Sequence, residues 1–251
     1  MEITSVNNET VKSVVKLKER KYRDISGKFL LEGYKSVYEA VKSGIELDKV
    51  FVLKEKAADY GFIKKELIIT SNNVLKKIST TETAPEIAAS AIQPRSNPEV
   101  LKSASKVILL ENTADAGNLG TIIRTAAAFG INAVILYGNT VDVYNPKCVR
   151  SSAGNLWKID IIKLKTLSEL KGYFSDYEKI AALPLSNSGT FLSNWHCSEK
   201  TIVMFGSESR GLTDELKQFA DKNLTIEMNQ DVESLNLAIS AGIIMYKMSC
   251  R

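Results

Sequence analysis

Cysteine and histidine are scarce in this sequence of 251 residues, which contains three cysteines and one histidine. A structural zinc site with four such ligands would need all of them, and Cys148, His196, Cys197 and Cys250 do not have the spacing of metal ligands. So few cysteines also argue against a small secreted domain held together by disulfides. We therefore expect no bound metal and a location in a reducing compartment, the cytoplasm.

Long apolar runs are also missing. The run from Val107 to Leu110, for example, is four residues long, whereas a membrane-spanning helix needs about 18 or more. The first residues, MEITSVNNETVKS, lack the apolar core of a signal peptide. Hydrophobic residues make up 44% of the chain and charged residues 25%, which excludes a disordered or collagen-like protein. The composition predicts a soluble protein of one or two domains, large enough to be an enzyme.

The positive charge is unevenly distributed. The chain has a net charge of +4, and the segment 12–28 alone carries +5, from seven basic and two acidic residues. Binding to a polyanion such as RNA is one interpretation, because phosphate contacts dominate the affinity for nucleic acids. A solvated helix face is the other, and charge alone favours it, since short lysine-rich helices are common.

The chain divides into two regions with different patterns of predicted helices and strands. In the first hundred residues helical and strand-like patterns alternate, and the stretch 92–98, with two prolines, is the best linker candidate. After it, short apolar strands alternate with helices, which is typical of a parallel sheet covered on both faces. We predict an α/β protein with a smaller N-terminal domain (1–93), a linker (94–105) and a parallel-sheet domain (106–251). The expected strands of the larger domain are 106–110, 133–137, 159–164, 180–183 and 201–205, and its expected helices are 119–129, 213–219 and 234–248.

Ligands of parallel sheets bind beyond the carboxyl ends of the strands, so the loops at that edge should carry the chemistry. The first such loop passes through Gly117 and Gly120 into a helix, with Asn118 near the helix start, where side-chain caps are expected. Arg124 follows in an apolar helix and should meet an anion, an ordinary buried ion pair being the alternative. The glycine pattern of a dinucleotide-binding loop is absent.

Two further loops combine glycine with polar residues. In the segment GSESRG, Gly206 lets a ligand approach the backbone, Gly211 can adopt a positive φ, and Glu208 places a carboxylate at the sheet edge. A tight turn with an acidic residue at a helix start would explain the same residues. In the third loop, Ser234 and Asn236 open an apolar helix, where helix capping alone would account for them.

The order and spacing of these loops resemble the three motifs of the SpoU/TrmH family of RNA ribose 2′-O-methyltransferases, which belong to the SPOUT class. The family's motifs include Asn-x-Gly followed by Arg, then Gly-x-Glu-x-x-Gly, and finally Glu-Ser-x-Asn; an Asn-Pro-Lys-x-x-Arg stretch lies between the first two. The matching residues are Asn118, Gly120, Arg124 and the segments 145–154, 206–212 and 233–236. The segments 3–5 and 29–33 resemble the family's accessory RNA-binding domain, which is similar to ribosomal protein L30e.

The resemblance implies methyl transfer from S-adenosylmethionine (AdoMet) to a ribose 2′-hydroxyl, without a metal. It implies a SPOUT domain with a deep trefoil knot that forms a homodimer, and an L30e-like substrate-binding domain. By analogy, ribosomal RNA is favoured as the substrate over transfer RNA. With an RNA enzyme as the expected identity, the segment 12–28 becomes an expected RNA contact.

The resemblance also assigns residues. The expected catalytic residues are Arg124, Asn118, Glu208, Ser234 and Asn236. The expected AdoMet-binding residues are Leu183, Gly206, Gly211, Ile226, Met228 and Leu235. The expected RNA-binding residues are Lys12, Lys16, Arg20, Lys21, Arg23 and Arg150. Two roles remain open for the catalytic arginine: it accepts the ribose proton, or it grips the ribose-phosphate and orients the hydroxyl, since a guanidinium resists deprotonation.

The sequence departs from the family pattern at Ala116, Ser207, Glu227 and Gln230. The last two lie in the loop that the family wraps around the cofactor, so they bear on cofactor affinity. Three alternatives stay open: a related methyltransferase that acts on a base, a ribose methyltransferase for transfer RNA, and an RNA-binding homologue that has lost catalysis. The sequence does not identify the RNA, the nucleotide or the position.

Overall fold

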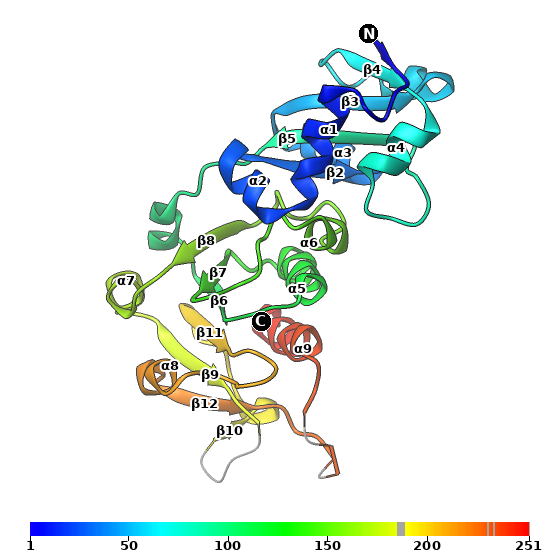
Figure 1. Ribbon diagram of the computed structural model, residues 1–251. Coiled ribbons are helices and arrows are strands. Elements are labelled where there is room, and N and C mark those ends of the chain that lie inside the picture. The colour runs from blue at the N-terminus through cyan, green and yellow to red at the C-terminus, as the bar shows by residue number, and fades with distance from the viewer. Residues whose placement is uncertain (185–188, 230, 233, 251) are drawn as a thin grey trace. The chain divides into compact units, whose positions relative to one another are not determined.

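The computed structural model describes residues 1–184, 189–229, 231–232 and 234–250 (Figure 1). The chain forms two compact units, each with its own sheet. Unit 1 contains 1–95 and 142–157, and unit 2 contains 96–141 and 158–251. The sequence does not indicate that 142–157 packs with the N-terminal residues, and the domain limits derived from it stay a prediction. No helix of the described chain is long and apolar enough to cross a membrane.

Unit 2 is built on a seven-stranded sheet in which every pairing is parallel, in the order β10-β12-β9-β11-β6-β7-β8. All residues of β7 and β11 are buried, as expected for a parallel sheet covered on both faces. The predicted α/β class is confirmed. The strands are β6 (Lys106–Glu111), β7 (Ala133–Tyr137), β8 (Asp160–Leu164), β9 (Glu178–Ala182), β10 (Thr190–Phe191), β11 (Thr201–Phe205) and β12 (Lys222–Thr225).

The helices of unit 2 begin at side-chain caps. Asp115 accepts a hydrogen bond from the backbone N–H of Asn118 (2.7 Å), so α5 begins earlier than predicted. Asn236 caps α9, which therefore begins after it and not at Ser234. The sequence missed α7, which begins at a capping box formed by Thr166 and Glu169. The elements are η3 (Pro98–Lys102), α5 (Ala116–Ala128), α7 (Leu167–Tyr173), η4 (Leu192–Asn194), α8 (Asp214–Phe219) and α9 (Leu237–Ser249).

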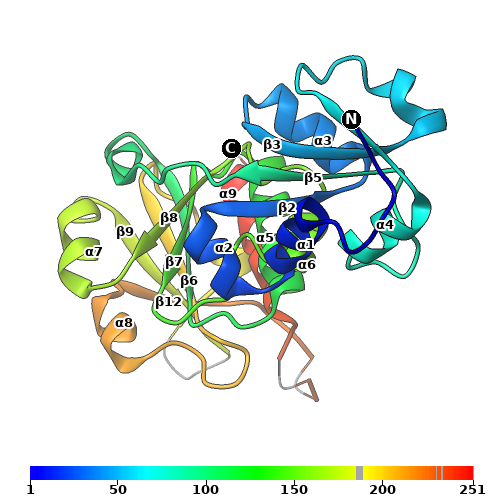
Figure 2. The same cartoon turned by 45° about the horizontal axis from the view of Figure 1, so that its top comes forward.

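Unit 1 has a mixed five-stranded sheet in the order β1-β4-β3-β5-β2. The pairs β1–β4 and β3–β4 are parallel, whereas β3–β5 and β2–β5 are antiparallel. Figure 2 shows α2 and α6 close to β2. The strands are β1 (Glu2–Ile3), β2 (Lys28–Glu32), β3 (Leu47–Leu53), β4 (Leu67–Thr70) and β5 (Ile87–Ile92). The helices are α1 (Glu9–Val15), η1 (Lys16–Lys18), α2 (Arg20–Ser26), α3 (Tyr34–Lys42), η2 (Lys54–Tyr60), α4 (Asn72–Ile78) and α6 (Pro146–Ser151).

Two sequence expectations for unit 1 are wrong in detail. The apolar residues Val11, Val14, Val15 and Leu17 have the spacing of one amphipathic helix over 11–18, but the structure divides this segment into α1 and η1. The pattern from Leu30 and Leu31 through Val37, Ala40 and Val41 predicts a helix that they lead into, but Leu30 and Leu31 belong to β2, where pairing with β5 buries them. Apolar pairs of this kind fit a buried strand and a buried helix equally well, so periodicity does not separate the two.

A buried ion pair holds the segment 142–157 against the rest of unit 1. The guanidinium of Arg23 donates through Nε to a carboxylate oxygen of Asp142 (2.7 Å), and both side chains are buried. The same guanidinium donates to the backbone carbonyls of Leu17 (2.8 Å) and Lys18 (2.9 Å). One arginine therefore connects α2, η1 and a segment about 120 residues later in the chain.

We predict that Arg23→Ala lowers the free energy of unfolding by about 3–5 kcal/mol, because it leaves the carboxylate of Asp142 buried without its partner. Arg20→Ala is the matched control, since the exposed pair of Arg20 with Asp24 (3.6 Å) should contribute about 0.5 kcal/mol or less. Urea-induced unfolding measures both variants. Equal losses in the two would show that the buried pair has no special importance.

Candidate active site

A cavity of about 230 Å³ opens in unit 2 beside the ends of β9, β11 and β12. Its wall includes all six residues that the sequence assigned to AdoMet. It also includes Glu208 and Ser234, two of the expected catalytic residues. Among the other lining residues, Leu237, Ser240 and Ile244 come from α9 and were not singled out from the sequence. Their spacing of three and four positions places them on one helix face, which is the signal that could have identified them.

The cavity wall depends on a sharp turn after β11. A Cβ atom added at Gly206 would lie 1.9 Å from the carbonyl carbon of Gly211, so only glycine fits. Gly211 has φ +66° and donates its N–H to the carbonyl of Ser207 (2.8 Å), which closes the turn. Glu111, at the end of β6, accepts hydrogen bonds from the N–H (2.8 Å) and hydroxyl (2.7 Å) of Thr213. The loop 206–213 is thus fixed at both ends.

Three of the expected catalytic side chains form one hydrogen-bonded chain. Asn236 donates through Nδ2 to Oδ1 of Asn118 (3.1 Å), and Asn118 donates through Nδ2 to the carboxylate of Glu208. Oδ1 of Asn236 accepts from the N–H groups of Ala238 (2.9 Å) and Ile239 (3.3 Å). Capping therefore orients Asn236, which orients Asn118, which in turn holds the carboxylate at the cavity.

Arg124 lies on α5, which also carries Asn118. Its side chain is exposed and has no hydrogen bond or ion pair with any described residue. The alternative of an ordinary buried ion pair is therefore wrong. The guanidinium is available to an anion from outside the chain, and the structure does not connect it to the hydrogen-bonded chain of Asn236, Asn118 and Glu208.

Of the two departures in the expected cofactor loop, Glu227 is described and Gln230 lies outside the described residues. Glu227 is exposed and does not line the cavity. It accepts hydrogen bonds from the N–H of Ser193 (3.1 Å) and from the hydroxyl of the same residue. Slight burial works to raise the pKa of Glu227, but these hydrogen bonds outweigh it and hold the pKa below its usual value. The carboxylate of Glu227 therefore bonds to Ser193 of η4 and adds no charge to the cavity wall.

Most charges of the segment 12–28 have partners within the chain. Arg23 is buried in its pair with Asp142, so the expectation that it contacts RNA is corrected. Lys12 pairs with Glu9 (2.8 Å), and Arg20 pairs with Asp24 (3.6 Å), both at the surface. The other two RNA contacts expected within this segment are Lys16 and Lys21. Their ammonium groups lie over the ring of Tyr22, at 5.5 and 5.8 Å from its centroid.

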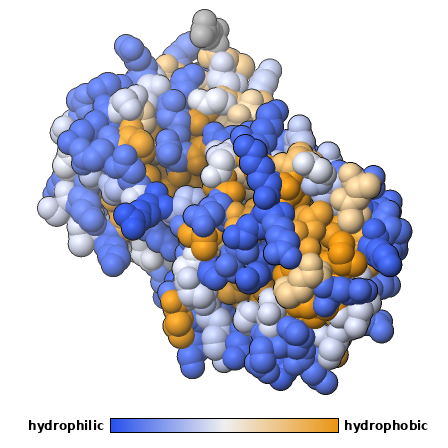
Figure 3. Space-filling model, turned by 90° about the horizontal axis from the view of Figure 1, so that it is seen from above, coloured by the Kyte–Doolittle hydropathy of each residue, from blue (hydrophilic) through white to orange (hydrophobic). Residues whose placement is uncertain are grey.

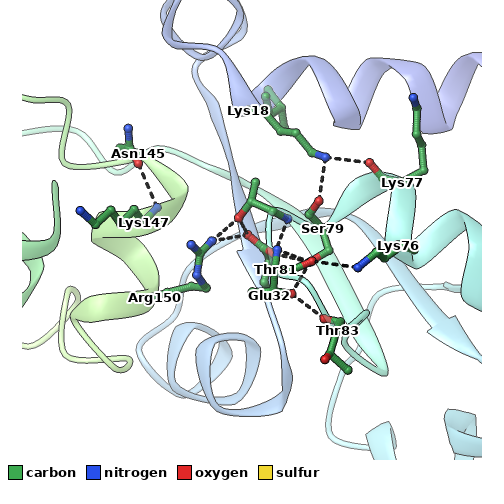
Figure 4. Close-up of polar contacts among 12 residues, drawn as sticks. Lys18, Glu32, Lys76, Lys77, Ser79, Thr81, Thr83, Asn145, Lys147 and Arg150 are labelled. Carbon is green, nitrogen blue, oxygen red and sulfur yellow. Dashed lines mark hydrogen bonds and ion pairs between the residues drawn. The ribbon is translucent and has the colours of Figure 1, made fainter.

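The remaining expected RNA contact, Arg150, reaches across to β2 (Figure 4). It donates to a carboxylate oxygen of Glu32 (3.0 Å) and to the hydroxyl of Thr80. Glu32 is nearly inaccessible and also accepts from the hydroxyl of Ser79 (2.7 Å) and the N–H of Thr80 (2.8 Å). Lys18 donates to two carbonyls of the same region, so the loop after α4 is held from both sides. Arg150 is a bridge within unit 1, and one third of its side chain is exposed.

The unit 2 fold and its cavity define an α/β enzyme domain that binds its ligand at the carboxyl edge of a parallel sheet. Residues 105–246 match the model of the SpoU rRNA Methylase family, and residues 8–89 match that of the MRM3-like substrate binding domain. The chain therefore belongs to the SpoU rRNA methylase family. The family resemblance drawn from the sequence is confirmed.

Individual relatives extend over both units. The chain is 32% identical to the 23S rRNA (guanosine(2553)-2′-O)-methyltransferase RlmP of Bacillus subtilis, with 98% of each chain covered. It is 26% identical to the 23S rRNA (uridine(2479)-2′-O)-methyltransferase of Streptomyces viridochromogenes, covering 98% of this chain and 90% of that one. An AdoMet-bound rRNA methyltransferase from Sinorhizobium meliloti superposes with a TM-score of 0.87 at 26% identity, covering 99% of this chain and 97% of that one.

We predict that Gly206→Ala abolishes AdoMet binding, measured by isothermal titration calorimetry, because the added methyl group would overlap the backbone of Gly211 and force the turn open. Gly172→Ala is the control, since no atom lies within 4 Å of a Cβ at this position in α7. In a helix this change should stabilise the protein by roughly 0.5–1 kcal/mol. If Gly206→Ala bound AdoMet with wild-type affinity, the turn after β11 would not be part of the cofactor site.

Proposed function

We propose that this protein transfers a methyl group from AdoMet to a ribose 2′-hydroxyl of 23S ribosomal RNA. The observation that carries the proposal is the hydrogen-bonded chain of Asn236, Asn118 and Glu208, which joins three loops around one cavity. Both curated relatives described above methylate ribose 2′-hydroxyls of 23S rRNA according to their names, and both match over nearly the whole of this chain. A transfer RNA substrate is the alternative.

The cavity suits the cofactor. Leu183, Ile226, Met228 and Leu235 supply apolar wall, and the loop from Gly206 exposes backbone to the cavity. Ligand sites for molecules with a flat ring commonly combine such walls with a few fixed polar groups. When bound, AdoMet supplies an electrophilic methyl group on a positively charged sulfur. Glu208 brings a carboxylate to the same wall, held in place by Asn118.

The chain must also position the hydroxyl that accepts the methyl group. Arg124 is exposed, charged and not engaged by any described carboxylate, so it can grip the ribose-phosphate with its planar fork of donors. Ser234, on the cavity wall, offers a hydroxyl for a hydrogen bond to the ribose. Fixing the nucleophile in the right geometry contributes a large share of rate in such transfers. Arg124 is therefore the residue to which the proposal gives the main catalytic role.

Unit 1 supplies contacts to the RNA. The ion pairs of Lys12 and Arg20 lie at the surface, where such pairs contribute little and can be exchanged for phosphate contacts. Lys16 and Lys21 carry their charge without an acidic partner among the described residues. Arg23 has no part in this contact because it is buried.

The proposed assembly is a cytoplasmic homodimer formed through unit 2, whose chain passes through a deep trefoil knot. Most of the face seen in Figure 3 is hydrophilic, with hydrophobic side chains in patches. Among the described residues, three exposed large hydrophobic side chains share α9: Ile239, Ile243 and Tyr246. Their spacing places them on one face of the helix, and α9 packs against α5, which carries Arg124. Covering this face with a second copy would bring the two chains together beside the proposed catalytic arginine.

We predict that Arg124→Ala retains AdoMet binding in calorimetry but lowers the rate of methyl transfer to 23S rRNA by at least about 100-fold, because the hydroxyl loses its positioning group. Transfer of a tritiated methyl group, followed by nuclease digestion to the methylated nucleoside, measures the rate and the site on the ribose. Arg95→Ala, which removes an exposed arginine of unit 1, is the control and should keep most of the activity. Wild-type transfer by Arg124→Ala would contradict the assignment.

The second candidate function is an RNA-binding homologue without catalysis. The departures from the family pattern at Glu227 and Gln230 keep it open. The wild-type protein distinguishes the two functions: an enzyme binds AdoMet with measurable heat, whereas a pure RNA-binding protein releases none. A product methylated on a base would instead favour the alternative of a related methyltransferase that acts on bases.

We predict that Ile239→Glu converts the dimer to monomers and abolishes methyl transfer, because a charge in an apolar interface cannot be solvated. Analytical ultracentrifugation measures the assembly. Ile25→Glu is the matched control, since this isoleucine of unit 1 is 73% exposed and should remain so in the dimer. An unchanged sedimentation coefficient in Ile239→Glu would exclude this face of α9 as the interface.

A further inference from the structure

Four aromatic rings form a cluster in unit 1. Tyr34 and Tyr38 lie one turn apart on α3, and Tyr60 and Phe62 come from the end of η2 and the turn after it. The ring of Tyr34 has its centroid 5.6 Å from that of Tyr38, 6.0 Å from Tyr60 and 5.9 Å from Phe62. The last two approach Tyr34 at angles, whereas Tyr34 and Tyr38 are stacked at 13°.

This cluster is buried at one end and open at the other. Tyr60 is 2% exposed, and burial raises the pKa of its hydroxyl. Tyr34 is 52% exposed, although burying a ring of this size would be favourable. The hydroxyls of Tyr34 and Tyr38 have no hydrogen-bond partner among the described residues. The exposed ring of Tyr34 therefore packs on the rings of Tyr38, Tyr60 and Phe62.

The backbone beneath Tyr34 is fixed. Glu32 is the last residue of β2 and Tyr34 the first of α3, with Gly33 between them at φ +81°. The carboxylate of Glu32 is held by Arg150, Ser79 and Thr80 (Figure 4). The start of α3 is therefore tied to the loop after α4.

Three lysines that lack an acidic partner among the described residues lie next to the aromatic residues in the sequence. Lys35 follows Tyr34 directly, and Lys64 and Lys65 follow Phe62 within about 7 and 11 Å along the chain. All three are exposed and form no ion pair within the described part of the chain. Of the neighbouring acids, Glu66 pairs with the N-terminus (3.1 Å) and Glu86 with Lys56 (3.0 Å), whereas Asp59, next to Tyr60, is exposed and forms no ion pair with a described residue.

We propose that Tyr34, supported by Tyr38 and Phe62, is a stacking platform for an unpaired base of the RNA substrate, while Lys35, Lys64 and Lys65 contact the adjoining phosphates. The inference rests on the proposed function and deepens it. Unpaired bases of RNA are recognised by stacking on aromatic rings, and exposed lysines beside the rings complement the phosphate backbone. A single open ring edged by lysines suits a base better than it suits the broad apolar surface of a protein partner.

The test uses the full-length protein and a 12-nucleotide unstructured RNA with one central 2-aminopurine, compared with the same strand in a duplex. Tyr34→Ala should bind the single strand about tenfold or more weakly, because one stacking contact is lost. It should also lose the quenching of 2-aminopurine fluorescence, while its affinity for the duplex stays unchanged. Tyr34→Phe, which keeps the ring, should behave as wild type.

Two further sets of variants separate folding and charge from stacking. Tyr34→Leu keeps an apolar cover over Tyr38 without a π face, so it should match Tyr34→Ala in RNA binding and wild type in thermal stability. Replacing Lys64 and Lys65 by alanine should lower the slope of log affinity against log salt by about one for each lysine, whereas Tyr34→Ala should not change it. Tyr173→Ala, a partly exposed aromatic position in unit 2, is the control.

Wild-type affinity and quenching in Tyr34→Leu would overturn the proposal, as would an equal loss of affinity for the duplex. A change of oligomeric state in Tyr34→Leu would show that a second copy of the chain covers the rings, which also overturns it. The readout does not involve methyl transfer. Stacking on Tyr34 in a protein that methylates no RNA would therefore leave this inference standing while the proposed function failed.

Discussion

The hydrogen-bonded chain from Asn236 through Asn118 to Glu208 is the constraint on which the site depends. It joins the starts of two helices to the turn after β11, across sequence separations of 118 and 90 residues. An amide has a donor end and an acceptor end, so each step determines the orientation of the next. Capping of α9 sets the direction of the first amide. A carboxylate is thereby held at the cavity by two amides in series, the first of which also caps α9.

The charges of unit 1 serve structure as much as recognition. A local charge of +5 over 12–28 resembles a simple RNA-binding surface in the sequence, but the structure gives most of these side chains internal partners. Arg23 stabilises the packing of 142–157, and Arg150 holds the loop after α4 through Glu32. The cations that remain without acidic partners include Lys16 and Lys21 at one place and the lysines beside the aromatic cluster at another.

The sequence predicted the parallel sheet well, because buried strands such as β7 and β11 are continuous apolar runs bounded by turn residues. It also selected residues that line the cavity and the three side chains that form the polar chain, since ordered motifs mark the carboxyl edge of the sheet. Pairings between distant residues were beyond it. Nothing near Arg23 in the sequence points to Asp142, and residues 34–62 give no sign that their rings meet. The cavity residues of α9 were missed because their apolar spacing also fits an ordinary core helix.

The most direct test of the central claim is a map of 2′-O-methylated riboses in 23S rRNA from cells with and without the gene for this protein. The account predicts that one ribose methylation disappears without the gene and returns when the wild-type protein is restored. Restoration by the Arg124→Ala protein should leave the site unmethylated. Identical maps with and without the gene, or loss of a base methylation alone, would contradict the account.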